Sequence, residues 1–341
     1  MIGAISERYH SEMDIRASVV DRSVAATAEA VIAASERLSP YALETPLVRA
    51  RSLASQAYFK CENLQRTGSF KLRGALNKLL TLTPETRERG VVASSTGNHG
   101  LAVAEALNLT SGRGSVVVSS SASSYKRERL TKAGLEVIVS DGDPMTAELE
   151  ARALAEKDGR IYISPYNDAD VIAGQGTVAV ELLAQHPTLE AVFVAVGGGG
   201  LVSGIASYLE SVRPDVSVIG CWPEDAAAMY ASVRAGRIIE VPDEPTLSDG
   251  TAGNIEPGAI TFPLCRDLID ELVLVSEEEI AAAMRDVMLA DHLVIEGAAG
   301  VAVAAWRKFT AGRPRLANRE SAIVLCGGNA SAPTLAQVLS A

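Results

Sequence analysis

From residue 90 onward, segments with the pattern of buried strands alternate with segments that have the pattern of helices. Parallel strands cannot be joined by a tight turn, so each connection needs a crossover of helix length, and this alternation is typical of βαβ units. The predicted strands are residues 91–93, 115–119, 135–140 and 161–163, and the predicted helices are residues 101–107, 123–133 and 144–156. We therefore expect a parallel sheet covered by helices.

The second half of the chain repeats this alternation. Residues 191–196 form a continuous apolar run, as expected of a strand buried on both faces of a sheet, and an apolar-periodic helix follows from Leu201. Further strands are predicted at residues 46–48, 58–62, 216–221, 271–275 and 323–326, and further helices at residues 24–37, 75–80 and 170–183. Residues 1–22 are polar and irregular, which predicts a flexible N-terminal arm. The whole pattern predicts a doubly wound α/β protein, and 341 residues are enough for two domains.

Charge and composition exclude several classes of partner. A net charge of −11 opposes binding to nucleic acid or to an anionic membrane, and it is still compatible with a local pocket for a phosphate. No apolar run approaches the roughly 20 residues of a membrane helix, and the charged N-terminus lacks the apolar core of a signal peptide. The four cysteines are far apart, without the spacing of a metal site or of a disulfide framework. We expect a cytoplasmic protein that binds a small molecule.

Lys71 lies between an aromatic and an aliphatic side chain, in the stretch Ser-Phe-Lys-Leu-Arg-Gly-Ala that covers residues 69–75. Burial of an ammonium group lowers its pKa, and a neutral amine is what reaction with an aldehyde requires. The alternative is an ordinary surface lysine at the start of a helix, which is the commoner situation for this residue type. The sequence around two other segments decides between these interpretations.

The first of these segments is the glycine run Gly197-Gly198-Gly199-Gly200, which follows the apolar strand and precedes the helix from Leu201. Unobstructed backbone N–H groups at a helix N-terminus bind anions, and a phosphate is the natural ligand. A tight turn between strand and helix is the alternative, although it needs fewer glycines. The run has neither the ending of an ATP-binding P-loop nor the spacing of a dinucleotide fingerprint, which disfavours a nucleotide-binding module.

The second segment, Ser94-Ser95-Thr96-Gly97-Asn98-His99-Gly100, brings three hydroxyls, an amide and an imidazole together just before a helix. Such a loop can hold a carboxylate through N–H and O–H donors. An ordinary loop with a helix cap is the alternative for an isolated cluster of this composition.

Together with Leu325-Cys326-Gly327-Gly328-Asn329, these motifs stand in the order found in the fold-type II pyridoxal-phosphate enzymes, and the chain resembles their threonine/serine dehydratase and serine racemase group. The resemblance runs from about Leu38 to the end of the chain. It implies a fold like that of the tryptophan synthase β chain, with two doubly wound parallel-sheet domains and the cofactor between them. The expected domains are a large one (residues 23–89 plus 168–341) and a small substrate-closing one (residues 90–167). A homodimer or homotetramer is also implied.

The resemblance also implies roles for individual residues. Lys71 binds the aldehyde of pyridoxal 5'-phosphate and later removes the substrate's α-proton, with Phe70 beside it. The substrate carboxylate is held by Ser95, Thr96, Asn98 and His99, and Asn98 also bonds the cofactor ring oxygen. The phosphate is held by Gly197, Gly198, Gly199, Gly200 and Leu201. Cys326 faces the ring nitrogen, unless it is only a buried structural cysteine, and Glu296 lies near the cofactor, unless it is only a charged helix start.

The implied reaction is β-elimination from a hydroxy amino acid such as L-threonine or L-serine, which yields a 2-oxo acid and ammonia. Thr96 stands where racemases of this group place a serine acid/base, so a racemase activity is an alternative, with Thr96 as a catalytic residue. The cation-binding positions of the racemases read Trp222 and Ala228 here, so no metal is expected. The chain ends soon after Asn329, without room for a regulatory domain, and it is similar to dehydratases of hydroxyectoine utilisation, which suggests a hydroxyectoine-derived hydroxy amino acid as another substrate.

Overall fold

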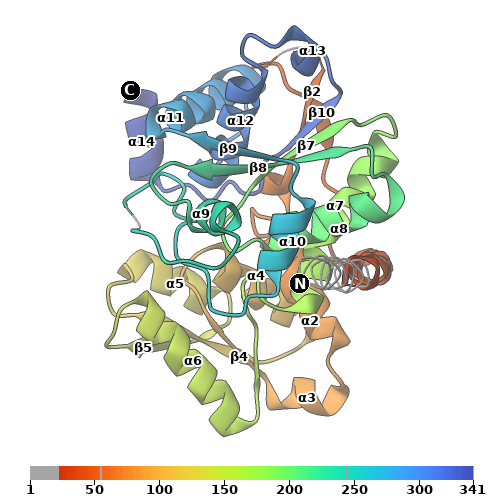
Figure 1. The fold of residues 1–341 in the computed structure, drawn as a ribbon. Coiled ribbons are helices and arrows are strands. Elements are labelled where there is room, and N and C mark those ends of the chain that lie inside the picture. Colours follow the sequence, from red (N-terminus) through yellow and green to blue (C-terminus); the bar gives the residue numbers. More distant parts are fainter. Residues whose placement is uncertain (1–22, 54–55, 243, 341) are drawn as a thin grey trace, which may run out of the picture.

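The computed structural model describes residues 23–53, 56–242 and 244–340, in which two sheets lie at opposite ends of the molecule (Figure 1). The predicted N-terminal arm, residues 1–22, lies outside the described residues. The larger sheet has six strands in the order β1-β2-β10-β7-β8-β9, and the smaller has four in the order β5-β4-β3-β6.

The larger sheet is parallel except for its edge strand β1, which pairs antiparallel to β2. Its strands are β1 (Leu47–Arg49), β2 (Ala57–Lys60), β7 (Ala191–Ala195), β8 (Ser217–Pro223), β9 (Glu271–Val275) and β10 (Ser321–Val324). Strand β7 is buried along its whole length because helices cover both faces of the sheet, as its unbroken apolar sequence predicts.

The smaller sheet is parallel throughout. Its strands are β3 (Val91–Ser94), β4 (Gly114–Ser119), β5 (Glu136–Ser140) and β6 (Ile161–Tyr162), and they alternate with α4 (Asn98–Thr110), α5 (Ser124–Lys132) and α6 (Pro144–Asp158). Asp143 caps α6 with its side chain and Pro144 fills the first helical position, so the start of this helix is fixed by local sequence.

Helices between the sheets carry the chain from one to the other. Helix α2 (Lys71–Thr81) contacts both α4 and α7 (Ala169–Gln185), and α7 contacts α8 (Gly200–Val212). Helices α7 and α8 approach closely at Gly176 and Gly204, since a Cβ atom at Gly204 would lie 2.6 Å from the Gly176 nitrogen. This close packing positions the N-terminus of α8 relative to the start of α2.

The remaining elements lie mostly around the larger sheet (Figure 1). Residues 23–38 are helical. The others are η1 (Glu62–Leu64), α3 (Pro84–Arg89), α9 (Ala228–Ala235), α10 (Thr261–Leu268), α11 (Glu277–Asp286), η2 (Val287–Asp291), α12 (Gly297–Thr310), α13 (Pro314–Ala317) and α14 (Ala332–Ser340).

The predicted α/β class with two parallel sheets is confirmed. Each predicted strand overlaps an observed strand, and the bounds differ only at the strand ends. The predicted domain bounds at residues 89/90 and 167/168 stay a prediction. One apolar core joins side chains of α2, such as Leu72 and Leu76, to Val91 of β3 and Val116 of β4. Helix α2 therefore packs against the smaller sheet, although the prediction assigns it to the large domain.

Candidate active site

A cleft of about 2460 Å³ opens where strands β3, β7 and β10 end and their connecting loops begin. Ligands of open parallel sheets bind outside the carboxyl ends of the strands, so this is the expected place for a site. All the site residues predicted from the sequence line this cleft, namely Phe70, Lys71, Ser95, Thr96, Asn98, His99, Gly197, Gly198, Gly199, Gly200, Leu201, Glu296 and Cys326.

Lys71 is the first residue of α2. The loop before it is attached to the segment that follows β10 by the Ser69–Gly327 bridge and by a hydrogen bond from the Phe70 N–H to the Cys326 carbonyl (3.0 Å). Its Nζ donates to the carbonyl of Pro165 at 2.8 Å and lies 5.1 Å from the centre of the Phe70 ring. Burial lowers the pKa of Lys71 to about 8, against the opposing effect of the acidic groups of Cys326 and Glu296. A lysine with this pKa is neutral in part near neutral pH and can act as a nucleophile or a base.

The glycine run forms the turn from β7 into α8. Gly199 has φ 88°, in the left-handed region that favours glycine. A Cβ atom at Gly198 would lie 2.4 Å from the Tyr166 ring, and one at Gly197 would lie 2.9 Å from the Thr251 backbone. The glycines thus admit these neighbours at close range, and the first N–H groups of α8 have no intrahelical acceptor. The turn has the chemistry of a phosphate site.

Asn98, at the start of α4, is held by Glu296 and Asn329. Its Nδ2 donates to both oxygens of Glu296, at 2.7 and 3.0 Å, and its Oδ1 accepts from Asn329 Nδ2 at 2.7 Å. Glu296 precedes α12 and is buried against Gly327, where a Cβ atom would lie 2.2 Å from the Glu296 Oε1. Burial raises the pKa of Glu296 to about 7, although the Asn98 hydrogen bond favours its ionised form. This arrangement fixes the orientation of the Asn98 amide.

The loop before α4 presents backbone N–H groups and hydroxyls to the cleft. Ser95 Oγ accepts from the Gly97 N–H at 3.1 Å, and Thr96 also lines the cleft. His99 is buried, with Nε2 2.9 Å from the Ile163 carbonyl, and burial lowers its pKa to about 3. His99 is therefore neutral, and the Ile163 bond requires the proton on Nε2, which leaves Nδ1 as an acceptor with no partner among the described residues. The free Nδ1 of His99 can accept a hydrogen bond from a ligand, but it cannot donate one to a carboxylate. The N–H groups at the N-terminus of α4 can bind an anion.

Cys326 follows β10 and is buried. Burial raises the pKa of its thiol well above the ordinary cysteine value. A neutral thiol beside Lys71 offers a weak hydrogen-bond donor and acceptor and no charge.

Among the cleft residues without a role in the sequence-based prediction, Asn329 and Tyr166 contact the predicted site residues. Asn329 bonds Asn98 and also Thr67 O, and it accepts from Arg129 at 3.2 Å. The available signal was its place at the end of the Leu325–Asn329 motif. The Tyr166 hydroxyl accepts from the Glu256 N–H at 3.1 Å, and its ring packs on Gly198. No sequence pattern predicts that contact.

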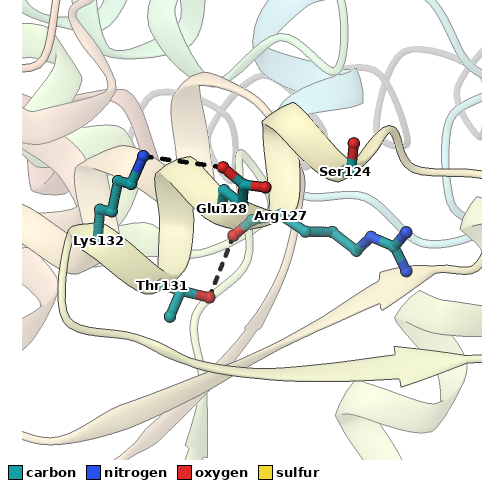
Figure 2. A pocket seen from close by; sticks show the side chains of 5 residues that line it. All are labelled: Ser124, Arg127, Glu128, Thr131 and Lys132. Atoms are coloured by element: carbon teal, nitrogen blue, oxygen red, sulfur yellow. Dashed lines mark hydrogen bonds and ion pairs between the residues drawn. The ribbon is translucent and has the colours of Figure 1, made fainter.

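Other features of the described residues add no second site. A smaller hollow of about 380 Å³ lies along α5 and is lined by Ser124, Arg127, Glu128, Thr131 and Lys132, which include none of the predicted site residues (Figure 2). Within the described ranges, no three His, Cys, Asp or Glu side chains are grouped so as to bind a metal. In the same ranges, no helix has the length and apolar character needed to cross a membrane.

Comparison with known proteins identifies the family. The chain is 42% identical over 274 residues to an L-threonine ammonia-lyase of Thermotoga maritima, covering 80% of this chain and 67% of the relative. It is 36% identical to a serine racemase of Arabidopsis thaliana, covering 87% of this chain and 91% of that one. The structure of the processed form of threonine deaminase isoform 2 from Solanum lycopersicum superposes with a TM-score of 0.88 at 31% identity, over 94% of this chain and 93% of that one. Residues 38–327 match the family described as pyridoxal-phosphate dependent enzymes, and the chain belongs to this family.

Proposed function

We propose that this chain catalyses β-elimination of a hydroxy amino acid such as L-threonine or L-serine, with release of a 2-oxo acid and ammonia. The observation that carries the proposal is the position of Lys71, whose pKa is lowered to about 8, in a cleft that the N-termini of α4 and α8 also face. One N-terminus suits the phosphate of the cofactor, and the other suits the carboxylate of an amino acid.

The residues present fit pyridoxal 5'-phosphate. Lys71 supplies the amine for its aldehyde, with Phe70 alongside. The glycine turn and Leu201 accommodate a phosphate, and the Asn98 amide, oriented by Glu296, suits the ring hydroxyl. Cys326 suits the ring nitrogen with a neutral thiol. When bound, this cofactor supplies an electron sink for charge that develops at the substrate's α-carbon.

The residues of this chain bind and orient the substrate and move its α-proton. The hydroxyls of Ser95 and Thr96 and the backbone N–H groups at the start of α4, including those of Asn98 and His99, hold the α-carboxylate. The neutral His99 side chain, which donates to the Ile163 carbonyl, takes no part. The Lys71 amine accepts the α-proton at Nζ, and the ammonium group so formed returns a proton to the β-hydroxyl, which leaves as water. Hydrolysis of the resulting enamine then gives the 2-oxo acid and ammonia.

The test is release of 2-oxo acid and ammonia by the purified protein with L-threonine, L-serine or 3-hydroxyaspartate. We expect equal amounts of the two products from at least one substrate, and a Lys71→Ala variant should lose at least about 10³-fold in kcat. A Lys71→Ala variant with full activity contradicts the proposal. The substrate range is supported by the relatives described as L-threonine ammonia-lyase and threonine deaminase.

Two further candidates have specific support. Racemisation of serine is favoured by the Thr96 hydroxyl in the cleft and by the Arabidopsis thaliana relative, and formation of D-serine from L-serine without ammonia release would reveal it. A hydroxyectoine-derived hydroxy amino acid is favoured by a cleft of about 2460 Å³, which has room beyond the cofactor and threonine. Binding of the cofactor with no turnover of the three test substrates would favour that class.

We also propose that the enzyme is cytoplasmic and works as a homodimer or homotetramer without a divalent cation, in two domains that close on the substrate. All four cysteines are buried as free thiols, which suits a reducing compartment. At the position of the racemase cation ligands, the described chain has the buried indole of Trp222. Size-exclusion chromatography with light scattering, and activity in the presence of a chelator, test these points.

A further inference from the structure

Four charged side chains form a buried ion cluster behind the catalytic face of α2. The cluster consists of Lys60 at the end of β2, Glu62 of η1, Arg73 of α2 and Glu181 of α7. The side chains of Lys60 and Glu62 are 0% exposed, that of Arg73 1% and that of Glu181 15%. Two cations and two anions balance one another, so the cluster is neutral.

Arg73 is the centre of this cluster and uses its whole guanidinium fork. It bonds both oxygens of Glu62, from Nε at 2.8 Å and from Nη2 at 2.7 Å. It also bonds both oxygens of Glu181, from Nη1 at 2.6 Å and from Nη2 at 3.0 Å. Thr177 Oγ1 and the Leu43 carbonyl accept further bonds. A planar group held from two sides by carboxylates has one orientation, which a lysine or an apolar side chain would not reproduce.

The cluster ties α2 to segments that are far apart in the sequence. Lys60 Nζ donates to Glu181, to Gln185 Oε1 at 3.0 Å and to the Thr45 carbonyl at 2.7 Å. Fully satisfied buried ion pairs contribute little net stability compared with an apolar core, and their best-attested use is to fix register. The cluster is therefore better explained by the placement of α2 than by stability alone.

Helices α2 and α7 also meet at two glycines beside the cluster. A Cβ atom at Gly174 would lie 2.7 Å from the Gly74 Cα, and the Gly74 N–H donates to Gln175 Oε1 at 3.2 Å. Contact at this range leaves α2 no room to slide on α7. Lys71 is two residues before Arg73, which is about 3 Å along the helix axis, and a slip of α2 by one residue would rotate Lys71 by about 100°.

We propose that Arg73 is a positioning residue for Lys71, acting through Glu62 and Glu181 to hold the first turn of α2 in the register that directs the Lys71 amine into the cleft. This inference rests on the proposed function of Lys71 as the residue that binds the cofactor. Arg73 itself does not line the cleft, so it acts through the position of the helix.

The test compares Arg73→Met and Arg73→Lys with Lys78→Met as a matched control. Lys78 lies on the same helix and also pairs with α7, through Asp168 at 2.7 Å and Asp170 at 3.0 Å. It is seven residues from Lys71, or about 10 Å along the helix. Reductive methylation of Lys71 in the cofactor-free proteins is followed by peptide mass spectrometry across pH, and the affinity for pyridoxal 5'-phosphate is measured by titration.

We expect Arg73→Met to weaken cofactor affinity at least about tenfold and to shift the pH midpoint of Lys71 methylation by about one unit or more. Arg73→Lys, which keeps the charge without the fork, should give a smaller change in the same direction. Lys78→Met should leave both quantities within about twofold of wild type, whatever its effect on Tm. If Arg73→Met does not fold, Arg73→Lys decides.

The proposal would be overturned if Tm falls in the folded Arg73 variants while the pH midpoint of Lys71 methylation and the cofactor affinity stay at wild-type values. Arg73 would then be a purely structural residue. A wild-type chain that binds no pyridoxal 5'-phosphate at Lys71 would instead overturn the proposed function. In that case the methylation profile of the cofactor-free variants still tests Arg73.

Discussion

Replacing Lys71 by methionine in the cofactor-free protein should change how the free energy of unfolding depends on pH. The pKa of Lys71 is lowered from the ordinary value of 10.5 to about 8 because the folded chain buries it. Between these two values the unfolded chain binds more protons than the folded chain, so stability due to this group rises with pH. Below about pH 8 the buried ammonium group lowers the free energy of unfolding of the wild type by its full amount. The methionine variant has no such group.

The magnitude follows from the two pKa values. At about 1.4 kcal/mol per pH unit, the wild type should gain about 2 kcal/mol relative to Lys71→Met between about pH 7 and about pH 9.5. Because Lys71 is half-buried, screening by solvent reduces the expected gain to about 1–2 kcal/mol.

The assay is urea unfolding of both cofactor-free proteins at several pH values, with the difference in unfolding free energy as the quantity compared. Titrating groups that do not interact with Lys71 cancel in that difference, and so does the loss of the bond from Lys71 to the Pro165 carbonyl. Glu296, which does interact with Lys71, titrates near pH 7 and affects mainly the lower end of the range. A difference that stays constant between pH 7 and pH 9.5 would refute the reasoning that burial lowers the pKa of Lys71.

Three other outcomes are expected. Gly198→Ala places a Cβ atom against the Tyr166 ring and should weaken pyridoxal 5'-phosphate binding at least about tenfold in a fluorescence titration, whereas Gly250→Ala, whose Cβ atom would meet nothing closer than 3.7 Å, should bind normally. The raised pKa of Glu296, about 7, predicts that the stability of the wild type relative to Glu296→Gln falls by up to about 2.5 kcal/mol as pH rises from about 5 to about 8 in urea unfolding; a rise would contradict the assigned direction. Thr96→Ala should lower any formation of D-serine from L-serine at least about tenfold while 2-oxo acid release changes about threefold or less, and equal loss of both would remove the distinct role in racemisation.

Much of the fold could be predicted because its strands carry strong local signals. The apolar run at residues 191–196 has no polar side chain, so burial on both faces was the natural interpretation, and β7 lies in the middle of the larger sheet. The helices between β3 and β6 were predicted from their alternation with strands and from the lengths of the connections. Strand order was not predictable, since the pairing of β10 with both β2 and β7 joins residues that are more than 100 positions apart.

The candidate site was predicted as a set of residues, because each motif stands at the end of a strand or the start of a helix. What the sequence could not predict are the contacts between motifs. The bond from Asn98 to Glu296 joins residues 198 positions apart, and Arg73 and Glu181 are 108 apart. Arg73 stood inside the lysine motif, yet nothing in its local pattern indicates burial, since arginine is seldom buried without partners that only the fold supplies.

The most direct test of the account is the covalent location of the cofactor. The holoenzyme is reduced with borohydride, digested and analysed by mass spectrometry for a peptide that carries a phosphopyridoxyl group. We predict a single modified site at Lys71. Modification at another lysine such as Lys60, or at none, would contradict the assignment of Lys71 as the residue around which this active site is built.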